Sequence, residues 1–121
     1  MDAMMMAFIS VLAGRGFNRR MMGDQVVMER KAYGSTPACK VVVDPWPGGR
    51  SRLQVVCNCA DVEASGVGGR TVLQRLADRL DKRAQQLLTG AREHRPHVAD
   101  ELHRLSADCR AAMTLCDATV S

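Results

Sequence analysis

Five cysteines are the side chains of this sequence best suited to covalent or metal chemistry. They are Cys39, Cys57, Cys59, Cys109 and Cys116. A tetrahedral zinc site needs four ligands and usually contains Cys-x2-Cys pairs, a spacing that none of these cysteines has. Secreted disulfide scaffolds are usually small and have an even number of cysteines. The odd number here, in a chain of 121 residues, therefore argues against that class of protein. We expect reduced thiols in a cytoplasmic protein with no metal and no cofactor, and keep a cysteine-based metal or redox protein as the third hypothesis of function.

Apolar residues alternate with others along 39–43 and 53–59, which predicts two strands with one shared apolar face. The loop between them, 44–51, contains two prolines and two glycines and predicts a hairpin. Matching the apolar faces pairs Val43 with Leu53, Val41 with Val55 and Cys39 with Cys57. A slip of two residues would pair Cys39 with Cys59 instead. Both registers place three thiols on the apolar face.

The glycine-rich segment 65–71 invites comparison with a phosphate-binding loop, because backbone amides at a helix N-terminus can bind phosphate. Ala64 stands where that loop has its first glycine, and Arg70 replaces its lysine. We therefore expect a flexible connection here, followed by a helix that begins at Thr71 and is capped by Thr71 and Gln74.

The histidines and serines form no catalytic pattern. His97 and Glu101 stand four residues apart, as in a pair that orients an imidazole, but no serine lies in a nucleophile-elbow motif. We expect no catalytic residues and a protein that is not an enzyme.

A one-sided basic stripe is predicted on the helix that starts at Thr71. At 100° per residue, four basic side chains fall within one arc: Arg75, Arg79, Lys82 and Arg83. Such a stripe can follow the phosphates of DNA or RNA, and the net charge of +4 permits this partner without requiring it. Nucleic-acid binding is therefore the second hypothesis of function.

The last quarter of the chain has the spacing of a helix that packs along its length against another helix. Apolar and small residues recur in steps of three and four at Val98, Leu102, Leu105, Cys109, Ala112 and Cys116. We call this row the seam and predict that it is an interface. Because the chain has few large side chains to cover the seam, we expect a homo-oligomer, most simply a dimer.

The N-terminal segment 1–22 is apolar and rich in methionine. Its apolar run, 3–13, is too short to span a bilayer, and Asp2 is the only charge before it. We expect a packed helix and no transmembrane segment. Met21, Met22 and Met28 stand as alternative translation starts.

These patterns predict a single α+β domain over 1–121. Its parts are an N-terminal apolar helix within 1–22, an antiparallel β-hairpin or three-stranded meander within 25–59, and a C-terminal antiparallel helical hairpin over 71–117. The first hypothesis of function is a small non-enzymatic interaction module that binds a protein partner, of the adaptor, inhibitor or chaperone-like kind, because the chain offers apolar helical surface and no catalytic set.

Overall fold

A computed structural model describes residues 1–120 as three helices and five strands. The helices are α1 (Ala3–Gly14), α2 (Gly69–Thr89) and α3 (Pro96–Val120). The strands are β1 (Asn18–Met22), β2 (Gln25–Arg30), β3 (Cys39–Trp46), β4 (Arg50–Cys57) and β5 (Ala60–Val67). A single 3₁₀ turn, Pro47–Gly49, joins β3 to β4.

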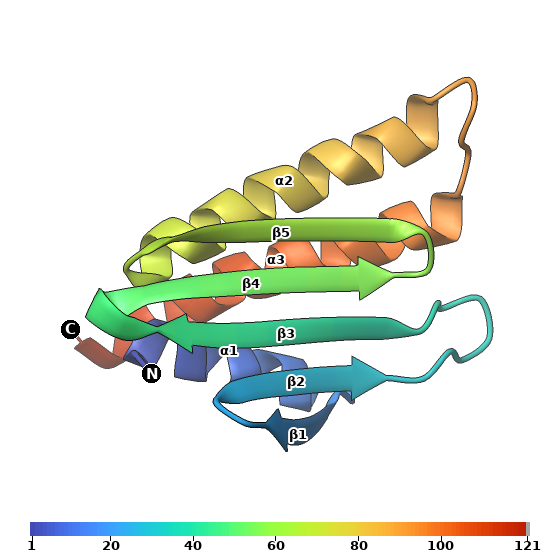
Figure 1. The fold of residues 1–121 in the computed structure, drawn as a ribbon. Coiled ribbons are helices and arrows are strands. Elements are labelled where there is room, and N and C mark those ends of the chain that lie inside the picture. The colour runs from blue at the N-terminus through green and yellow to red at the C-terminus, as the bar shows by residue number, and fades with distance from the viewer. Residues whose placement is uncertain (121) are drawn as a thin grey trace.

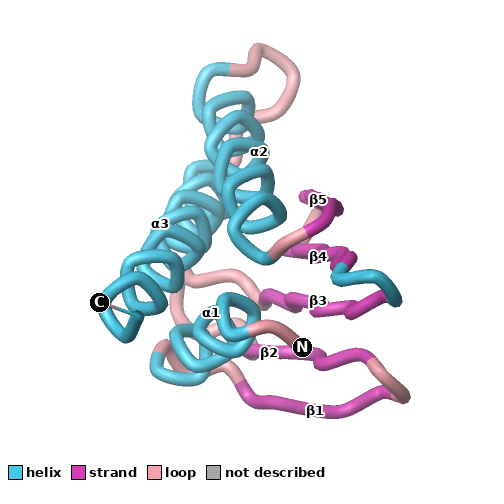
Figure 2. The backbone as a smooth tube through the Cα atoms, turned by 90° about the vertical axis from the view of Figure 1, so that its left-hand side faces the viewer, coloured by secondary structure: helices cyan, strands magenta, loops and turns pink. Residues whose placement is uncertain are grey.

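The strands form one antiparallel sheet in which each strand pairs with the next along the chain. β1 and β5 are therefore its two edges, as Figure 1 shows. The side view in Figure 2 places all three helices on the same face of the sheet, with α1 near β2 and α2 near β5. None of the three α-helices lies on the opposite face, and we call it the open face.

α1 forms because Asp2 caps an apolar run. The Asp2 carboxylate accepts a hydrogen bond of 2.8 Å from the Met5 N–H, as an N-cap side chain does. The buried residues share one helical stripe: Met5, Phe8, Ile9 and Leu12. Gly16, with φ of 88°, lets the chain turn from the helix toward β1.

The core lies between the sheet and the helices. Along β4 every second residue is buried, which is the period of a strand with one covered face. The predicted register of β3 on β4 is confirmed: Val43 pairs with Leu53, Val41 with Val55 and Cys39 with Cys57. The predicted helical hairpin is confirmed as well, since α2 and α3 pack together along their length.

The sheet is larger than the sequence patterns predict. Strands were expected only within 25–59, whereas β1 and β5 lie outside this range and enlarge the meander to five strands. Both are edge strands. β1 is exposed along its whole length and has no apolar alternation. β5 does alternate apolar and polar residues, but its apolar residues, such as Ala60 and Ala64, are small. The expected helix start was also wrong: α2 begins at Gly69, without a side-chain cap, and Gln74 bonds Asp78 instead.

Candidate functional site

Two of the four residues predicted to bind nucleic acid contact the edge of the sheet. Arg75 Nη1 donates a hydrogen bond of 2.8 Å to the Ser65 carbonyl, and Arg79 Nη1 donates one of 2.7 Å to the Glu63 carbonyl. An edge strand leaves every second carbonyl unpaired and open to another chain. The two arginines therefore cap the β5 edge.

The turn between β4 and β5 explains why these carbonyls face outward. The two-residue turn 58–59 joins Cys57 to Ala60, and such a hairpin is closed by a hydrogen-bonded pair. Hydrogen-bonded and non-hydrogen-bonded pairs alternate along an antiparallel ladder. Counted from this turn, Glu63 and Ser65 occupy non-hydrogen-bonded pairs with β4, so their backbone groups face away from the sheet.

The other two basic residues are placed differently. Arg83 Nη2 lies 3.0 Å from the Glu93 carboxylate, whereas Lys82 is exposed. The basic stripe is thus largely engaged by the protein itself. Nucleic-acid binding stays an untested alternative. The basic stripe offers it fewer unpaired charges than the sequence suggested.

The start of α2 is occupied by the protein's own carboxylate. A Cβ on Gly69 would lie 2.7 Å from both Asp2 carboxylate oxygens and 2.6 Å from the Met4 Cβ. Glycine is required here because α1 approaches the start of α2 so closely. The Asp2 carboxylate also suits the positive end of the α2 dipole, which explains the glycine-rich segment without phosphate.

The seam lies on α3 and is buried inside the chain. Five of its residues are at most 4% exposed, namely Val98, Leu102, Leu105, Cys109 and Ala112, while Cys116 is partly exposed. α3 packs against α2 and α1, so the partner helices that the spacing implied belong to the same chain. The seam is therefore not available to a second copy of the chain. The homo-oligomer stays a prediction, but an uncovered seam no longer supports it.

The β1 edge is open, in contrast to the β5 edge. All five residues of β1 are exposed, including Met21 at 55% and Met22 at 48%. The two-residue turn 23–24 makes Met22 and Gln25 a hydrogen-bonded pair. Hydrogen-bonded and non-hydrogen-bonded pairs alternate along the β1–β2 ladder, so the N–H and C=O groups of Arg19 and Met21 point away from β2. We use "β1 edge" for these outward groups of Arg19 and Met21.

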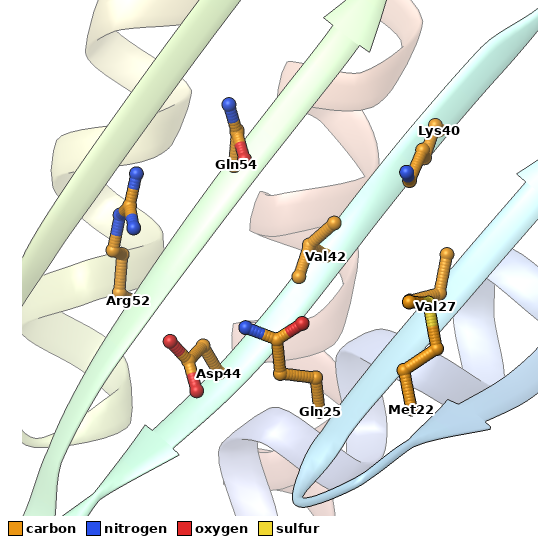
Figure 3. Close-up of a pocket in the computed structure, with 8 residues that line it drawn as sticks. All are labelled: Met22, Gln25, Val27, Lys40, Val42, Asp44, Arg52 and Gln54. Carbon is orange, nitrogen blue, oxygen red and sulfur yellow. The ribbon is translucent and has the colours of Figure 1, made fainter.

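The open face holds a shallow hollow of about 170 Å³. Figure 3 shows its lining across β1 to β4: Met22, Gln25, Val27, Lys40, Val42, Asp44, Arg52 and Gln54. Its floor is apolar, and its charges are mixed, with basic and acidic side chains side by side. This mixture lacks the convergent charge of a site for a small charged ligand.

A buried ionic cluster joins α3 to the N-terminal half of the chain. The Glu101 carboxylate is 3.0 Å from Arg15 Nη2 and 2.8 Å from Arg30 Nη2, and Asp108 accepts a bond of 2.7 Å from Arg15 Nε. Both guanidinium groups lie over the Phe17 ring, at 5.7 and 4.7 Å from its centroid. Burial raises the pKa of Asp108, and the Arg15 charge partly offsets that rise. No local pattern in the sequence points to this cluster, because its members are up to 93 residues apart.

The cysteines do not gather as three. Cys39 and Cys57 are neighbours on the buried face, but Cys59 lies exposed in the β4–β5 turn and Cys109 is buried on α3. Burial raises the pKa of Cys109 above its ordinary value. Within residues 1–120, no group of three or more Cys, His, Asp or Glu side chains is placed to hold a metal ion.

His97 does not pair with Glu101, whose carboxylate faces the two arginines instead. A polar group on the helices is found around Asp81, whose carboxylate is 2.9 Å from Arg110 Nη2 and 3.2 Å from His103 Nδ1. Partial burial opposes ionisation of Asp81, but hydrogen bonds from Ser106, His103 and Arg110 outweigh it and lower the pKa of Asp81.

The pH dependence of stability should report this group. A lowered pKa in the folded state stabilises the fold above the unfolded pKa of about 3.9, and that contribution is lost as the pH falls through the folded pKa. Asp81→Asn should therefore lower the free energy of unfolding at neutral pH, by at most about 1 kcal/mol for so exposed a pair. The deficit should vanish near pH 2, as measured by urea unfolding. Asp24→Asn, in the exposed β1–β2 turn, is the control for removing one carboxylate and should change the free energy of unfolding little at neutral pH. An Asp81→Asn deficit that is equal at both pH values would contradict the assignment.

Comparison with protein-family models, with curated proteins and with solved structures finds no match to this chain. Across residues 1–120, no helix has both the length and the apolar character needed to cross a membrane. The candidate functional surface must therefore be argued from the geometry alone, and the β1 edge is its most specific feature.

Proposed function

We propose that this protein is a non-enzymatic interaction module that binds an extended segment of a partner protein along the β1 edge. The observation that supports it is the difference between the two edges of one sheet. Arg75 and Arg79 cap two outward carbonyls of β5, those of Ser65 and Glu63, whereas the outward groups of Arg19 and Met21 on β1 are exposed. A free strand edge can pair with an extended peptide through main-chain hydrogen bonds.

The charge of β1 favours an acidic and apolar partner segment. Arg19 contacts the Met21 sulfur at 3.9 Å and, among the described residues, has no carboxylate within ion-pair distance. Arg20 is held by Glu29 at 2.5 Å. Exposed methionines give an adaptable apolar contact. A segment that sets an acidic side chain beside Arg19 and apolar side chains beside Met21 and Met22 would thus find both a charge and a surface to match.

Pairing of β1 with a second copy is disfavoured by the same charges. A symmetric antiparallel pair that uses the outward groups of both Arg19 and Met21 would set Arg20 opposite its own copy. Directly opposed like charges destabilise a sheet. We therefore place a heterologous segment on the β1 edge, and a homo-oligomer, if it forms, must use another surface.

Selection from a library of displayed ten-residue peptides, followed by anisotropy measurements on the best synthetic binder, tests the proposal. Met21→Pro removes an outward N–H without touching the β1–β2 ladder and should weaken binding by about tenfold or more, since a hydrogen bond and close strand contact are lost. Ser65→Pro makes the matched change on the capped β5 edge and should leave the affinity unchanged. Equal effects of the two prolines would refute binding at β1.

A second matched pair of variants tests the role of charge at the β1 edge. Arg19→Glu should lower the affinity for an acidic peptide severalfold, because the substitution reverses the charge at the β1 edge. The affinity of the variant should also fall more steeply as salt is added. Arg92→Glu changes the net charge equally but lies in the exposed α2–α3 loop, and should have no effect. A preference for basic peptides in the wild-type protein would contradict the proposed partner chemistry.

A further inference from the structure

The only tryptophan of the chain is exposed on the open face, at the end of β3. Trp46 follows Asp44 by two residues and so shares the open face with it, where Figure 3 shows Asp44. Trp46 pairs with Arg50 of β4, and Arg50 pairs with Val67 of β5, so the three side chains lie side by side on this face. Trp46 is 53% exposed, Val67 is 60% exposed, and Arg50 is exposed between them. We call these three residues the Trp46 row.

The indole ring of Trp46 is held at its edge, while much of its surface stays exposed. Trp46 Nε1 donates a hydrogen bond of 2.8 Å to the Asp44 carboxylate. The turn after Trp46 is tied to the end of β5, because the Gly68 N–H donates a bond of 3.1 Å to the Gly49 carbonyl. Among the described residues the guanidinium–ring contacts belong to Phe17, so no arginine lies over the indole. The ring is therefore available to stack with another flat group.

A hollow of about 150 Å³ adjoins the indole ring. Arg50, Arg52 and Ser65 line it with side chains of the open face. Between these side chains the hollow is lined by the backbone of Ser51 and Gly66, which pair with each other across β4 and β5. The Ser51 side chain points to the buried face and Gly66 has none, so only backbone forms the floor. The ring, the guanidinium groups and the hollow are therefore all reached from the same side of the sheet.

The charge around this hollow is positive on balance. Arg52 donates to the Glu63 carboxylate at 2.5 Å, and the Asp44 carboxylate accepts from the indole. Arg50 has no carboxylate within ion-pair distance among the described residues. Arg75 contacts the β5 backbone from the other side and donates to a carbonyl, which does not cancel its charge. Three guanidinium groups thus stand against two carboxylates, and Arg50, the unpaired one on the open face, lies beside the indole.

A partner that matches this surface carries a flat ring next to a negative charge, and the base and phosphate of a nucleotide are such a pair. We propose that the Trp46 row binds single-stranded nucleic acid, with a base stacked on the Trp46 indole and the neighbouring phosphate bound by Arg50. Duplexes fit this surface poorly, because their bases are already stacked and paired. The Trp46 row lies on β3 to β5 and the β1 edge lies at the opposite side of the sheet, so this function is independent of peptide binding.

The fluorescence of Trp46 reports stacking directly, because the chain has no other tryptophan. Titration of the full-length protein with a single-stranded oligo(dT) octamer at low salt should quench this fluorescence saturably. An octamer of abasic units keeps the phosphates but has no bases, and should bind about tenfold more weakly and without quenching. Equal affinity for the two octamers, or binding of oligo(dT) without quenching, would overturn the proposal. An octaglutamate peptide that binds as tightly as oligo(dT) would make this surface a site for acidic peptides and would overturn it as well.

The role of the ring is tested by two substitutions of Trp46, with the affinity measured by the anisotropy of a fluorescein-labelled oligo(dT) octamer. Trp46→Leu should lower the affinity about tenfold, because the stacked base loses its platform. Trp46→Phe keeps an aromatic ring and should keep most of the affinity. The exposure of Trp46 favours folding of both variants, which circular dichroism checks. A folded Trp46→Leu protein that binds as tightly as the wild type would refute stacking on this ring.

The role of Arg50 is tested by reversing its charge. Arg50→Glu should lower the affinity for oligo(dT) severalfold and flatten the slope of log K against log salt by about 0.7, the value for one phosphate contact on a single strand. Arg92→Glu, in the exposed α2–α3 loop, makes the same change in net charge and should leave this slope unchanged. Met21→Pro, which alters the β1 edge, should leave the affinity for oligo(dT) unchanged, so the two proposed sites succeed or fail separately. Equal effects of the two charge reversals would refute phosphate binding at the Trp46 row.

Discussion

Replacing Glu101 with glutamine should lower the free energy of unfolding by about 3–5 kcal/mol, the cost of breaking a buried ion pair from one side. Glu101 is 1% exposed and is the only acceptor shared by Arg15 and Arg30 among the described residues. Without its charge, Arg30 keeps its position over Phe17 but loses its carboxylate. The remaining acid, Asp108, bonds only Arg15. Urea unfolding at neutral pH measures the loss.

The matched control lies on the surface. Glu63 accepts from Arg52 at 2.5 Å, but the glutamate side chain is 56% exposed, so Glu63→Gln should cost less than about 1 kcal/mol. A second variant, Arg30→Met, separates charge from packing. If Glu101 and Arg30 act as one unit, the double variant should be less destabilised than the sum of the singles. Additive losses, or a Glu101→Gln loss no larger than that of Glu63→Gln, would show that the cluster is effectively hydrated.

The parts of the fold that were predicted from sequence are those with a strong local period. The wide apolar face of α2 and the seam on α3 each repeat over several turns, whereas α1 was indicated by its continuous apolar run. The register of β3 on β4 followed from matching two alternating apolar faces, because a one-residue slip would expose every buried side chain. These features depend on neighbours in the chain or on one shared face.

The two edge strands were missed for different reasons. β5 carries the alternation of a half-covered strand, with Ala60, Val62 and Ala64 buried, but its apolar side chains are small and it runs into the glycine-rich segment that predicts a flexible connection. β1 buries none of its side chains, so its strand structure comes from pairing with β2, a tertiary contact that leaves little pattern in composition. The sequence therefore indicated the centre of the sheet and missed both of its edges.

In the candidate site as well, local spacing was predictable from sequence and tertiary contacts were not. The basic stripe was correctly located on α2, but the contacts of Arg75 and Arg79 depend on β5, which the sequence did not predict. The seam was correctly recognised as a packing surface, yet its partners, α2 and α1, lie in the same chain. Spacing predicts that a face is covered, and it does not identify the chain that covers it.

Replacing Phe8 with alanine should destabilise the protein by about 3–5 kcal/mol, because a fully buried aromatic side chain leaves a cavity. Phe8 is 0% exposed in α1, which packs against α3 and lies over the β2 side of the sheet. The apolar, methionine-rich composition of 1–22 left open whether this segment belongs to the fold at all. Thermal and urea unfolding of Phe8→Ala measure its contribution directly.

Met6 provides the control on the same helix. Its side chain is 48% exposed, so Met6→Ala should change the free energy of unfolding by no more than about 0.5 kcal/mol. A large loss for Phe8→Ala beside a small one for Met6→Ala means that α1 is docked in solution with the face seen here. Since α1 covers the half of the sheet that α2 and α3 leave bare, a chain begun at Met21 should then fail to fold cooperatively. Equal and small losses for both variants would mean instead that α1 is not docked, and that β2 and β3 are covered by something other than this helix.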